Sequence, residues 1–224
     1  MSASDQAEPI EKSIRLWPCN PGIALSSVQT SLLNLYLDEL VKWNRKINLT
    51  GLRSRQKMIH ELLLDSLLPI PYLPVQGRFL DVGSGAGFPS IPLRICFSGP
   101  VFHLVEPILK KTNFLKQVIR LAGLKDIEVI RGRVEDLDGV IEGEGYNVVL
   151  SRGLSLDSQV LSCCAALLAK EALLFTFQGT SKQFHQERLV GEGKKHGFSL
   201  QESIPYTVPG VALPRRLVIF KKDR

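Results

Sequence analysis

Phe79-Leu80-Asp81-Val82-Gly83-Ser84-Gly85-Ala86-Gly87-Phe88 is an apolar run that ends at an acid and continues into alternating glycines. This order predicts a buried strand that turns sharply into a helix through a loop of bare backbone. Glycine adopts positive φ without a Cβ clash, so the loop can approach a ligand closely and direct amide groups at it. A glycine-rich turn that serves only packing is the alternative interpretation.

The spacing of the glycines indicates which ligand the loop would bind. The dinucleotide fingerprint Gly-x-Gly-x-x-Gly needs a third glycine at the position that Phe88 occupies. The pattern Asp-x-Gly-x-Gly-x-Gly is instead typical of S-adenosylmethionine loops. We therefore expect S-adenosylmethionine as the cofactor, with these candidate contacts in the loop: Asp81, Gly83, Gly85, Gly87 and Phe88.

The residues after the loop alternate between helix and strand patterns at the spacing of βαβ units. Helices are expected over 89–95, 109–121, 157–168 and 181–196. Strands are expected over 101–105, 127–130, 146–152, 173–177, 198–202 and 217–221. The last two have no helix between them, so they should pair antiparallel through a loop over 205–214. Five βα units closed by a hairpin indicate an α/β fold, the doubly wound Rossmann-like sheet of class I S-adenosylmethionine methyltransferases; a dehydrogenase would continue with parallel crossovers.

Polar residues stand at the ends of four expected strands: Asp81, Glu106, Glu135 and Arg152. Ligands of open parallel sheets lie outside the carboxyl ends of the strands, so these side chains should converge. Glu106 follows the loop by about twenty residues and can accept both ribose hydroxyls of an adenosine. The alternative for Glu106 is a carboxylate placed near the positive end of a helix dipole.

Composition excludes several classes of protein. At 224 residues with 44% hydrophobic residues, the chain can bury a full core. It contains neither an apolar run near eighteen residues nor a basic-then-apolar N-terminus, so we expect a cytoplasmic protein without a membrane segment. The cysteines lack Cys-x-x-Cys spacing and should be reduced packing residues, and the histidines lack paired metal-ligand spacing, so no metal site is expected. Nothing in the sequence suggests an obligate oligomer, and we expect a monomer.

Three segments are expected along the chain. Residues 1–25 are polar, contain Pro18, Pro21 and Gly22, and are typical of a mobile or loosely docked lead-in. Residues 26–75 form an N-terminal helical extension, and 76–224 form the methyltransferase domain. Within the extension, helices are expected over 26–44 and 57–68, the first with one apolar stripe. The stripe consists of Val28, Leu32, Leu35, Tyr36, Leu40, Trp43 and Ile47.

Positive charge is concentrated at two places in a chain of net charge +6. The first place lies between the two helices of the extension and has no acid among its cations: Lys42, Arg45, Lys46, Arg53, Arg55 and Lys57. The second comprises Arg215, Arg216, Lys221 and Lys222. Solvated surface is the ordinary interpretation of such runs, but together with the predicted fold they favour a nucleic acid partner, whose phosphates supply most of the affinity.

Several motifs together resemble the RsmG (GidB) family. They are Trp43-Asn44-Arg45-Lys46-Ile47-Asn48-Leu49-Thr50, Leu64-Asp65-Ser66, and the loop continued through Pro89 to Ile91-Pro92-Leu93. The resemblance runs from about residue 26 to residue 221. That family methylates N7 of one guanine in the 530 loop of bacterial 16S rRNA. The resemblance therefore implies 16S rRNA or the small ribosomal subunit as the partner.

The resemblance also implies roles for individual residues. Gly83 and Phe88 would line the cofactor, Glu106 would take the ribose, Val134 and Glu135 would meet the adenine, and Arg152 would sit beside the reactive centre. With the basic segments, it implies these contacts to RNA: Arg45, Lys46, Arg53, Lys110, Arg215 and Arg216. The chain departs from the family at three places, having Glu106-Pro107 for Asp-Ser, Gln178 for Lys and Leu62 for His.

The residues after the fourth strand agree with transfer to guanine N7. N7 is a lone-pair acceptor without a proton, so no general base is required and catalysis reduces to orientation. Enzymes that methylate exocyclic amines place Asn or Asp, Pro-Pro and an aromatic where this chain has Ser151-Arg152-Gly153. Arg152 is the catalytic candidate, orienting cofactor or target; an ion pair to Glu135 or Asp81 is the alternative. A methyltransferase of another substrate and an inactive rRNA-binding assembly factor remain open as functions.

Overall fold

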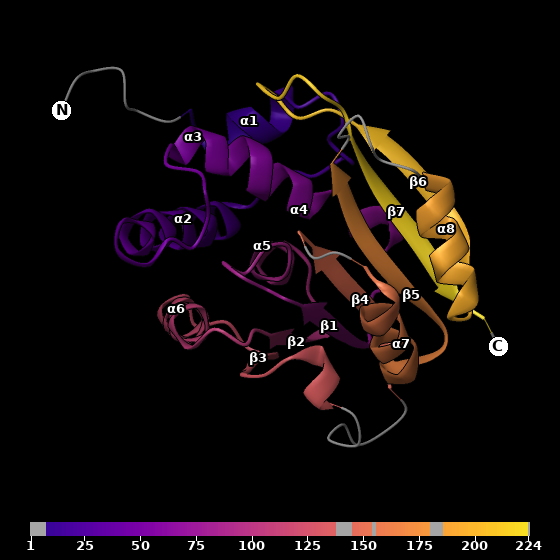
Figure 1. Ribbon diagram of the computed structural model, residues 1–224. Helices are drawn as coiled ribbons and strands as arrows, with labels where there is room; N and C mark the ends of the chain where they lie inside the picture. Colours follow the sequence, from indigo (N-terminus) through magenta and orange to yellow (C-terminus); the bar gives the residue numbers. More distant parts are fainter. Residues whose placement is uncertain (1–7, 138–144, 154–155, 180–185, 224) are drawn as a thin grey trace.

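The computed structural model describes residues 8–137, 145–153, 156–179 and 186–223. Within these ranges the strands form one seven-stranded sheet in the order β3-β2-β1-β4-β5-β7-β6 (Figure 1). The strands are β1 Arg78–Val82, β2 Val101–Val105, β3 Ile127–Ile130, β4 Tyr146–Arg152, β5 Leu168–Gly179, β6 Phe198–Tyr206 and β7 Arg215–Lys222. β1 to β5 are parallel, and β7 runs antiparallel to both β5 and β6. The doubly wound sheet with an antiparallel C-terminal hairpin is therefore confirmed.

Helices cover both faces of the sheet, because successive strand residues point to opposite sides. On β1, Phe79 belongs to one hydrophobic core and Leu80 to the other. The helices of the domain are α5 Ser90–Cys96, α6 Leu109–Leu121, η3 Val134–Leu137 (a 3₁₀ turn), α7 Ser158–Leu167 and α8 Gln186–Lys195. Figure 1 shows α5 and α6 on one face of the sheet and α7 and α8 on the other. This is the three-layer α/β architecture that buries a parallel sheet on both sides.

The predicted elements differ little from the observed ones. The strands over 101–105, 127–130 and 146–152 and the helix over 109–121 have the predicted bounds. β5 is longer than expected because it begins directly after α7 and pairs first with the start of β4. Residues 181–185 of the helix expected over 181–196 lie outside the described residues.

The N-terminal extension packs on the same face as α5 and α6. It contains α1 Ile10–Leu16, α2 Ser27–Ile47, α3 Arg55–Met58, a π-helical turn η1 Ile59–Leu64, α4 Asp65–Leu67 and the 3₁₀ turn η2 Ile70–Tyr72. α2 begins at a capping box, in which Ser26 Oγ accepts from the Gln29 amide and Gln29 Oε1 accepts from the Ser26 amide. The Tyr36 hydroxyl donates to the Ala86 carbonyl at 2.7 Å, which fastens α2 to the glycine loop.

Two expectations for this part of the chain need correction. A mobile or loosely docked lead-in was expected over 1–25, but Ile10, Ile14 and Trp17 are buried, and the Trp17 indole donates to the Thr207 carbonyl at 2.7 Å. These apolar residues anchor α1 despite its polar flanks. The apolar stripe of α2 was correct in part: Tyr36 and Leu40 are buried, and Leu32, Trp43 and Ile47 pack against the core. Val28, however, is 66% exposed, so the fully buried face differs from the predicted stripe. The residues on that face are Leu33, Tyr36, Leu37 and Leu40.

Candidate functional site

The glycine loop after β1 has the conformation that its sequence predicts. Gly83, Gly85 and Gly87 have φ of 72°, 58° and 95°, values that side chains rarely adopt. A Cβ on Gly87 would lie 2.5 Å from Ile91 Cγ1 and 2.9 Å from Leu115 Cδ2, so the loop is also packed closely on α5 and α6. The Gly83 amide donates to the Val105 carbonyl at 3.0 Å, which holds the loop against the end of β2.

Glu106 connects this loop to the next strand. It lies directly after β2 and is buried, and its Oε2 accepts from the Gly85 amide at 2.9 Å. Its Oε1 accepts from the Ile108 amide, also at 2.9 Å. Each carboxylate oxygen has two lone pairs, so both oxygens keep capacity for a further donor such as a ribose hydroxyl. The carboxylate therefore braces the loop and can still bind a sugar.

Asp81 is a buried acid whose charge is not neutralised by a close partner. Its side chain is 1% exposed, and neither carboxyl oxygen forms a hydrogen bond of normal geometry among the described residues. Burial raises the pKa of Asp81 to about 7, although Ser90 and Ser84 lie close enough to oppose this rise. The hydroxyl of Ser90, at the start of α5, likewise lacks a partner within the described ranges. Buried polar atoms left in this way call for a polar ligand or water, and the ammonium of an amino acid moiety would satisfy a carboxylate.

A pocket of about 150 Å³ opens beside the loop. Its walls are mostly apolar, and Gly83 of the loop and Glu135 are also among the lining residues, which suits a flat heteroaromatic ring. The lining residues are Val82, Gly83, Val105, Pro107, Gly132, Arg133, Val134, Glu135 and Val160. Val134 and Glu135 come from η3, so the pocket joins the ends of β1, β2 and β3.

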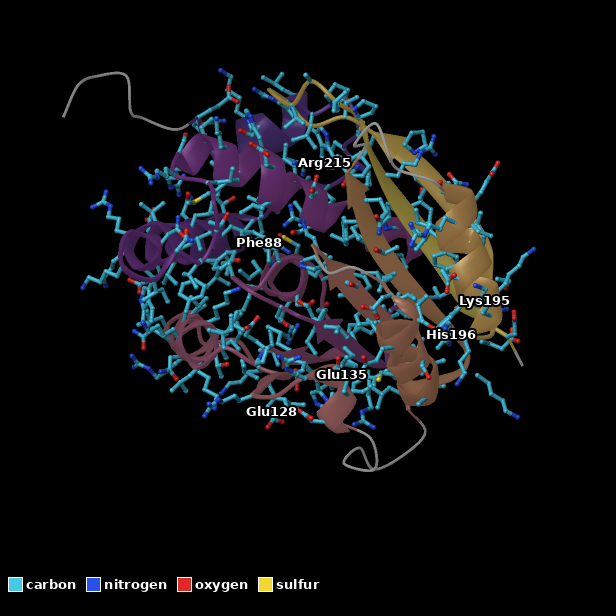
Figure 2. All side chains as sticks on the ribbon, viewed as in Figure 1. Phe88, Glu128, Glu135, Lys195, His196 and Arg215 are labelled. Carbon is cyan, nitrogen blue, oxygen red and sulfur yellow. The ribbon has the colours of Figure 1, made fainter. Side chains whose placement is uncertain are left out.

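Phe88 and Lys110 lie at the margins of this region. Phe88 is 5% exposed, and its ring packs against that of Tyr36 with centroids 5.1 Å apart. Figure 2 shows Phe88 beside α5 and Glu135 well separated from it. The Phe88 side chain thus packs against α2 in the core and supports the end of the glycine loop from that side. Lys110 is exposed in the first turn of α6, four residues after Glu106.

Arg152 and Arg215 meet on the N-terminal extension. The ion pair of Arg152 is with Asp65, at 3.1 Å, rather than with either partner considered from the sequence, Glu135 or Asp81. Arg152 Nη2 also donates to the Glu61 carbonyl at 2.7 Å. Arg215 Nη1 donates to the same carbonyl at 2.8 Å and to Asp65 Oδ2, and its Nη2 pairs with Glu61 Oε2 at 3.1 Å. Two cations thus share one buried carboxylate, and Arg215 is not an unpaired surface cation.

A basic groove lies at the C-terminal end of α2. It has a volume of about 810 Å³, and Arg45, Lys46 and Arg53 line it; no acid does so among the described residues. Asn44 shapes the groove, because its Nδ2 donates to the Leu52 carbonyl and its Oδ1 accepts from the Thr50 amide, both at 2.8 Å. Three of the residues predicted to contact RNA, Arg45, Lys46 and Arg53, therefore lie together in one groove.

The other cations of the two basic clusters lie elsewhere. Lys42 pairs with Glu39 and Arg55 with Asp38. Arg216 donates to Ser203 Oγ at 3.1 Å, within the β6–β7 hairpin. Adjacent residues of a strand point to opposite faces, so Arg215 and Arg216 cannot serve one surface.

Sequence reasoning assigned no role to three residues of the site. Asp65 and Glu61 receive the two arginines, and Tyr206, the last residue of β6, lies in the electrostatic field of Asp65, Arg215 and Arg152. The signal for Asp65 was available: it is a charged residue that directly follows the apolar run Leu62-Leu63-Leu64.

Within the described residues, no helix is long and apolar enough to span a membrane, and no group of three or more His, Cys, Asp and Glu side chains could hold a metal ion. Among the same residues the four cysteines are free thiols, and the amide of Thr207 donates to Cys19 Sγ at 3.4 Å.

An open sheet of this strand order, with a positive-φ glycine loop after β1 and an acid after β2, defines the Rossmann-like class I S-adenosylmethionine-dependent methyltransferases. Residues 29–217 match the model of one family, the rRNA small subunit methyltransferase G (GidB) family. The chain belongs to that family.

Individual relatives agree with this assignment. The chain is 31% identical to ribosomal RNA small subunit methyltransferase G 1 of Syntrophobacter fumaroxidans over 218 residues, 96% of this chain and 98% of the relative. It is 36% identical to ribosomal RNA small subunit methyltransferase G of Shewanella amazonensis over 197 residues, 88% of this chain and 91% of the relative. The match thus includes the N-terminal extension.

Solved structures show the same fold at low identity. A 1,6-didemethyltoxoflavin-N1-methyltransferase of Burkholderia thailandensis, with S-adenosylhomocysteine bound, has a TM-score of 0.59 at 14% identity, covering 90% of this chain and 93% of that chain. A SAM-dependent methyltransferase of Methanosarcina mazei has a TM-score of 0.58 at 14% identity, covering 69% and 96%.

Proposed function

We propose that this protein transfers the methyl group of S-adenosylmethionine to N7 of a guanine in the 530 loop of 16S rRNA in the small ribosomal subunit, as a monomer in the cytoplasm. Membership of the methyltransferase G family supports the reaction and the substrate class. The observation that carries it is the contact between Gly85 and Glu106, which joins a positive-φ glycine loop to a buried ribose-accepting acid.

The residues around the loop fit the three parts of the donor. The pocket lined by Val134 and Glu135 would take the adenine, and the free lone pairs of Glu106 would take the ribose hydroxyls. The unpartnered carboxyl of Asp81 and the hydroxyl of Ser90 would take the amino acid moiety. When bound, S-adenosylmethionine supplies an electrophilic methyl group on a sulfonium.

The protein then has to position a base rather than move a proton. Guanine N7 has a lone pair and no hydrogen, so positioning and electrostatics supply the catalysis. Arg152 lies at the end of β4, and its charge acts on both Asp81 and Tyr36, so it lies near the proposed donor site. We assign it the orientation of the target.

The basic groove would hold the RNA backbone. Arg45, Lys46 and Arg53 line a concave surface on the extension, where phosphates can lie against several cations at once. Lys110, exposed beside the Glu106 turn, would contact RNA nearer the reactive centre. Arg215 is bound to Asp65 and Glu61, so its contribution would be to the shape of the site.

The test is methyl transfer from labelled S-adenosylmethionine to small subunits purified from a strain that lacks this enzyme, followed by mapping of the modified nucleotide. Labelling of one guanine at N7 in the 530 loop is the expected result. Labelling at another nucleotide would overturn the site assignment. Binding of the subunit and of the donor without any transfer would indicate an assembly factor.

A further inference from the structure

Six of the eight buried side-chain polar atoms that lack a partner among the described residues lie at two places around the proposed reactive centre; the other two are Thr30 Oγ1 and Ser151 Oγ. The first comprises Asp81 and Ser90, which the donor would satisfy. The second comprises Asp65 Oδ1, Arg152 Nε and the Tyr206 hydroxyl. These come from α4, the end of β4 and the end of β6, so elements distant in the sequence bring them together. We call this second group the Asp65–Arg152–Tyr206 site.

The side chains of this site are held firmly. Asp65 is 1% exposed and Tyr206 2% exposed. Asp65 Oδ2 is already bound by both Arg152 and Arg215, so Oδ1 is the acceptor that remains. Burial and then the nearby carboxylate of Asp65 raise the pKa of the Tyr206 hydroxyl, but the two side chains do not form a hydrogen bond of normal geometry. Packed side chains with unused hydrogen-bonding atoms are costly to maintain for stability alone. The arrangement therefore calls for a polar ligand that completes it.

The chemistry of the site defines that ligand. Asp65 Oδ1 accepts hydrogen bonds, Arg152 Nε donates one, and the Tyr206 hydroxyl can do either. The Watson–Crick edge of guanine has the complementary order, with the donors N1–H and N2–H₂ beside the acceptor O6. A base bound by this edge directs its N7 away from Asp65, which leaves the lone pair free.

The site also lies next to the proposed donor position. β4 pairs with β1 so that Ser151 lies opposite Val82, which places Arg152 beside the start of the glycine loop, and Arg152 also forms an ion pair with Asp65. Tyr36, which lies in the field of Arg152, donates to Ala86 of the same loop. Arg152 therefore bridges the two groups of unpartnered atoms.

We propose that the Asp65–Arg152–Tyr206 site binds the Watson–Crick edge of the target guanine. Asp65 Oδ1 accepts from N1–H and the exocyclic amine, and Arg152 Nε donates to O6. This inference rests on the proposed function and adds to it the means by which guanine is selected. It also requires that the target base is unpaired when it binds, because pairing occupies the same edge.

An analogue of the target base tests this assignment. Small subunits are reconstituted with guanosine or inosine at the methylated position; inosine lacks the exocyclic amine but keeps N7, O6 and N1–H. For the wild-type enzyme, kcat/KM should be at least about tenfold lower with inosine, because a charged acceptor loses one donor. Donor affinity, measured by calorimetry, should not depend on the base.

Asp65→Asn should remove this discrimination. The two guanidinium groups require an acceptor at the Oδ2 position, so the amide oxygen takes that place and the amide nitrogen replaces Oδ1. A donor then faces the donors of guanine, and kcat/KM for guanosine should fall about 100-fold while the guanosine-to-inosine ratio approaches one. If Asp65→Asn is less active but keeps the wild-type ratio, Asp65 has only a structural role and the proposal is wrong.

Tyr206→Phe covers the case in which Asp65→Asn does not fold. It should lower kcat/KM for guanosine about tenfold without changing donor affinity. Tyr146→Phe is the matched control, since its hydroxyl bonds His103 at 2.7 Å at the opposite end of β4, and it should keep wild-type activity. Wild-type kcat/KM in Tyr206→Phe, or equal use of inosine and guanosine by the wild type, would overturn the proposal. Failure of the wild type to methylate guanosine subunits would instead refute the proposed function.

Discussion

The guanidinium groups of Arg152 and Arg215 donate to the same two acceptors, the Glu61 carbonyl and Asp65 Oδ2. Arg152 ends β4 and Arg215 begins β7, while both acceptors lie in or just after the π-helical turn of the extension. Figure 2 shows Arg215 next to this helical segment. The orientation of Arg152 therefore depends on the extension, which makes the extension part of the proposed active site.

Arg152→Ala should lower methyl transfer about 100-fold or more, because the target loses its orienting cation. Single-turnover transfer to small subunits measures the effect. Arg94→Ala is the matched control: Arg94 is also largely buried and ion-paired, with Asp126 at 3.1 Å, but lies on α5 away from the target side. Wild-type turnover in Arg152→Ala would exclude Arg152 from the mechanism.

Glu106→Gln should weaken donor binding about tenfold or more, since the amide cannot replace a carboxylate that accepts from the Gly85 and Ile108 amides and from the ribose. Calorimetry with S-adenosylmethionine gives the affinity directly. Glu128→Gln changes an exposed acid on β3 and should leave the affinity unchanged. Equal affinities in Glu106→Gln and wild type would rule out the ribose assignment.

Asp81 should make stability depend on pH. Its pKa is about 7 in the folded protein and near 3.8 in the unfolded chain, so the folded state binds the proton more tightly. The stabilisation is complete below about pH 4 and is lost as pH rises to about 7. Urea unfolding from pH 4 to 8 should show this loss in the wild type and a flatter profile in Asp81→Asn. A cationic donor should correspondingly bind more tightly as pH rises through about 7. Parallel stability profiles for the two proteins would contradict the assignment.

The basic groove should give RNA binding its salt dependence. Removing two phosphate contacts with Arg45→Ala and Arg53→Ala should reduce the slope of log K against log salt by roughly 1.4 to 1.8. Filter binding to small subunits between about 50 and 200 mM salt checks this. Lys195→Ala, on α8 at the opposite side of the molecule from α2 (Figure 2), should leave the slope as it is. An unchanged slope in the double variant would assign the groove to ordinary surface.

Gly87→Ala should destabilise the fold by about 2 kcal/mol or more, because the positive φ strains an alanine and the new Cβ meets Ile91 and Leu115. Urea unfolding measures the change. Gly191→Ala is the control, since this glycine lies in α8 with open space around it and should tolerate or favour alanine. Equal stability of Gly87→Ala and wild type would show that the loop can relax away from α5 and α6.

The sheet and the glycine loop could be predicted because their signals are local. Apolar runs of strand length between turn residues located β2, β3 and β4 with correct bounds, and the spacing of Gly83, Gly85 and Gly87 required positive φ. The convergence of Glu106 and Glu135 on one end of the sheet follows from parallel topology alone.

Arg152 was predicted as a site residue, but the contacts that hold it could not be predicted, because they are long-range. Asp65 is 87 residues from Arg152 and 150 from Arg215 along the chain. No periodic pattern in the sequence predicts that two cations from different strands contact the same carboxylate. The burial of α1 was missed for a similar reason, since Trp17 contacts Thr207, 190 residues away.

The bond between Trp17 and Thr207 bears on how this enzyme can be shortened. Thr207 directly follows Tyr206, and residues 10–17 lie outside the region matched by the family model, which begins at residue 29. Removing residues 1–17 alone would leave every residue that lines the donor pocket in place but would remove the contact that holds the segment after Tyr206. Such a truncated enzyme should still bind S-adenosylmethionine but lose its selectivity for guanine.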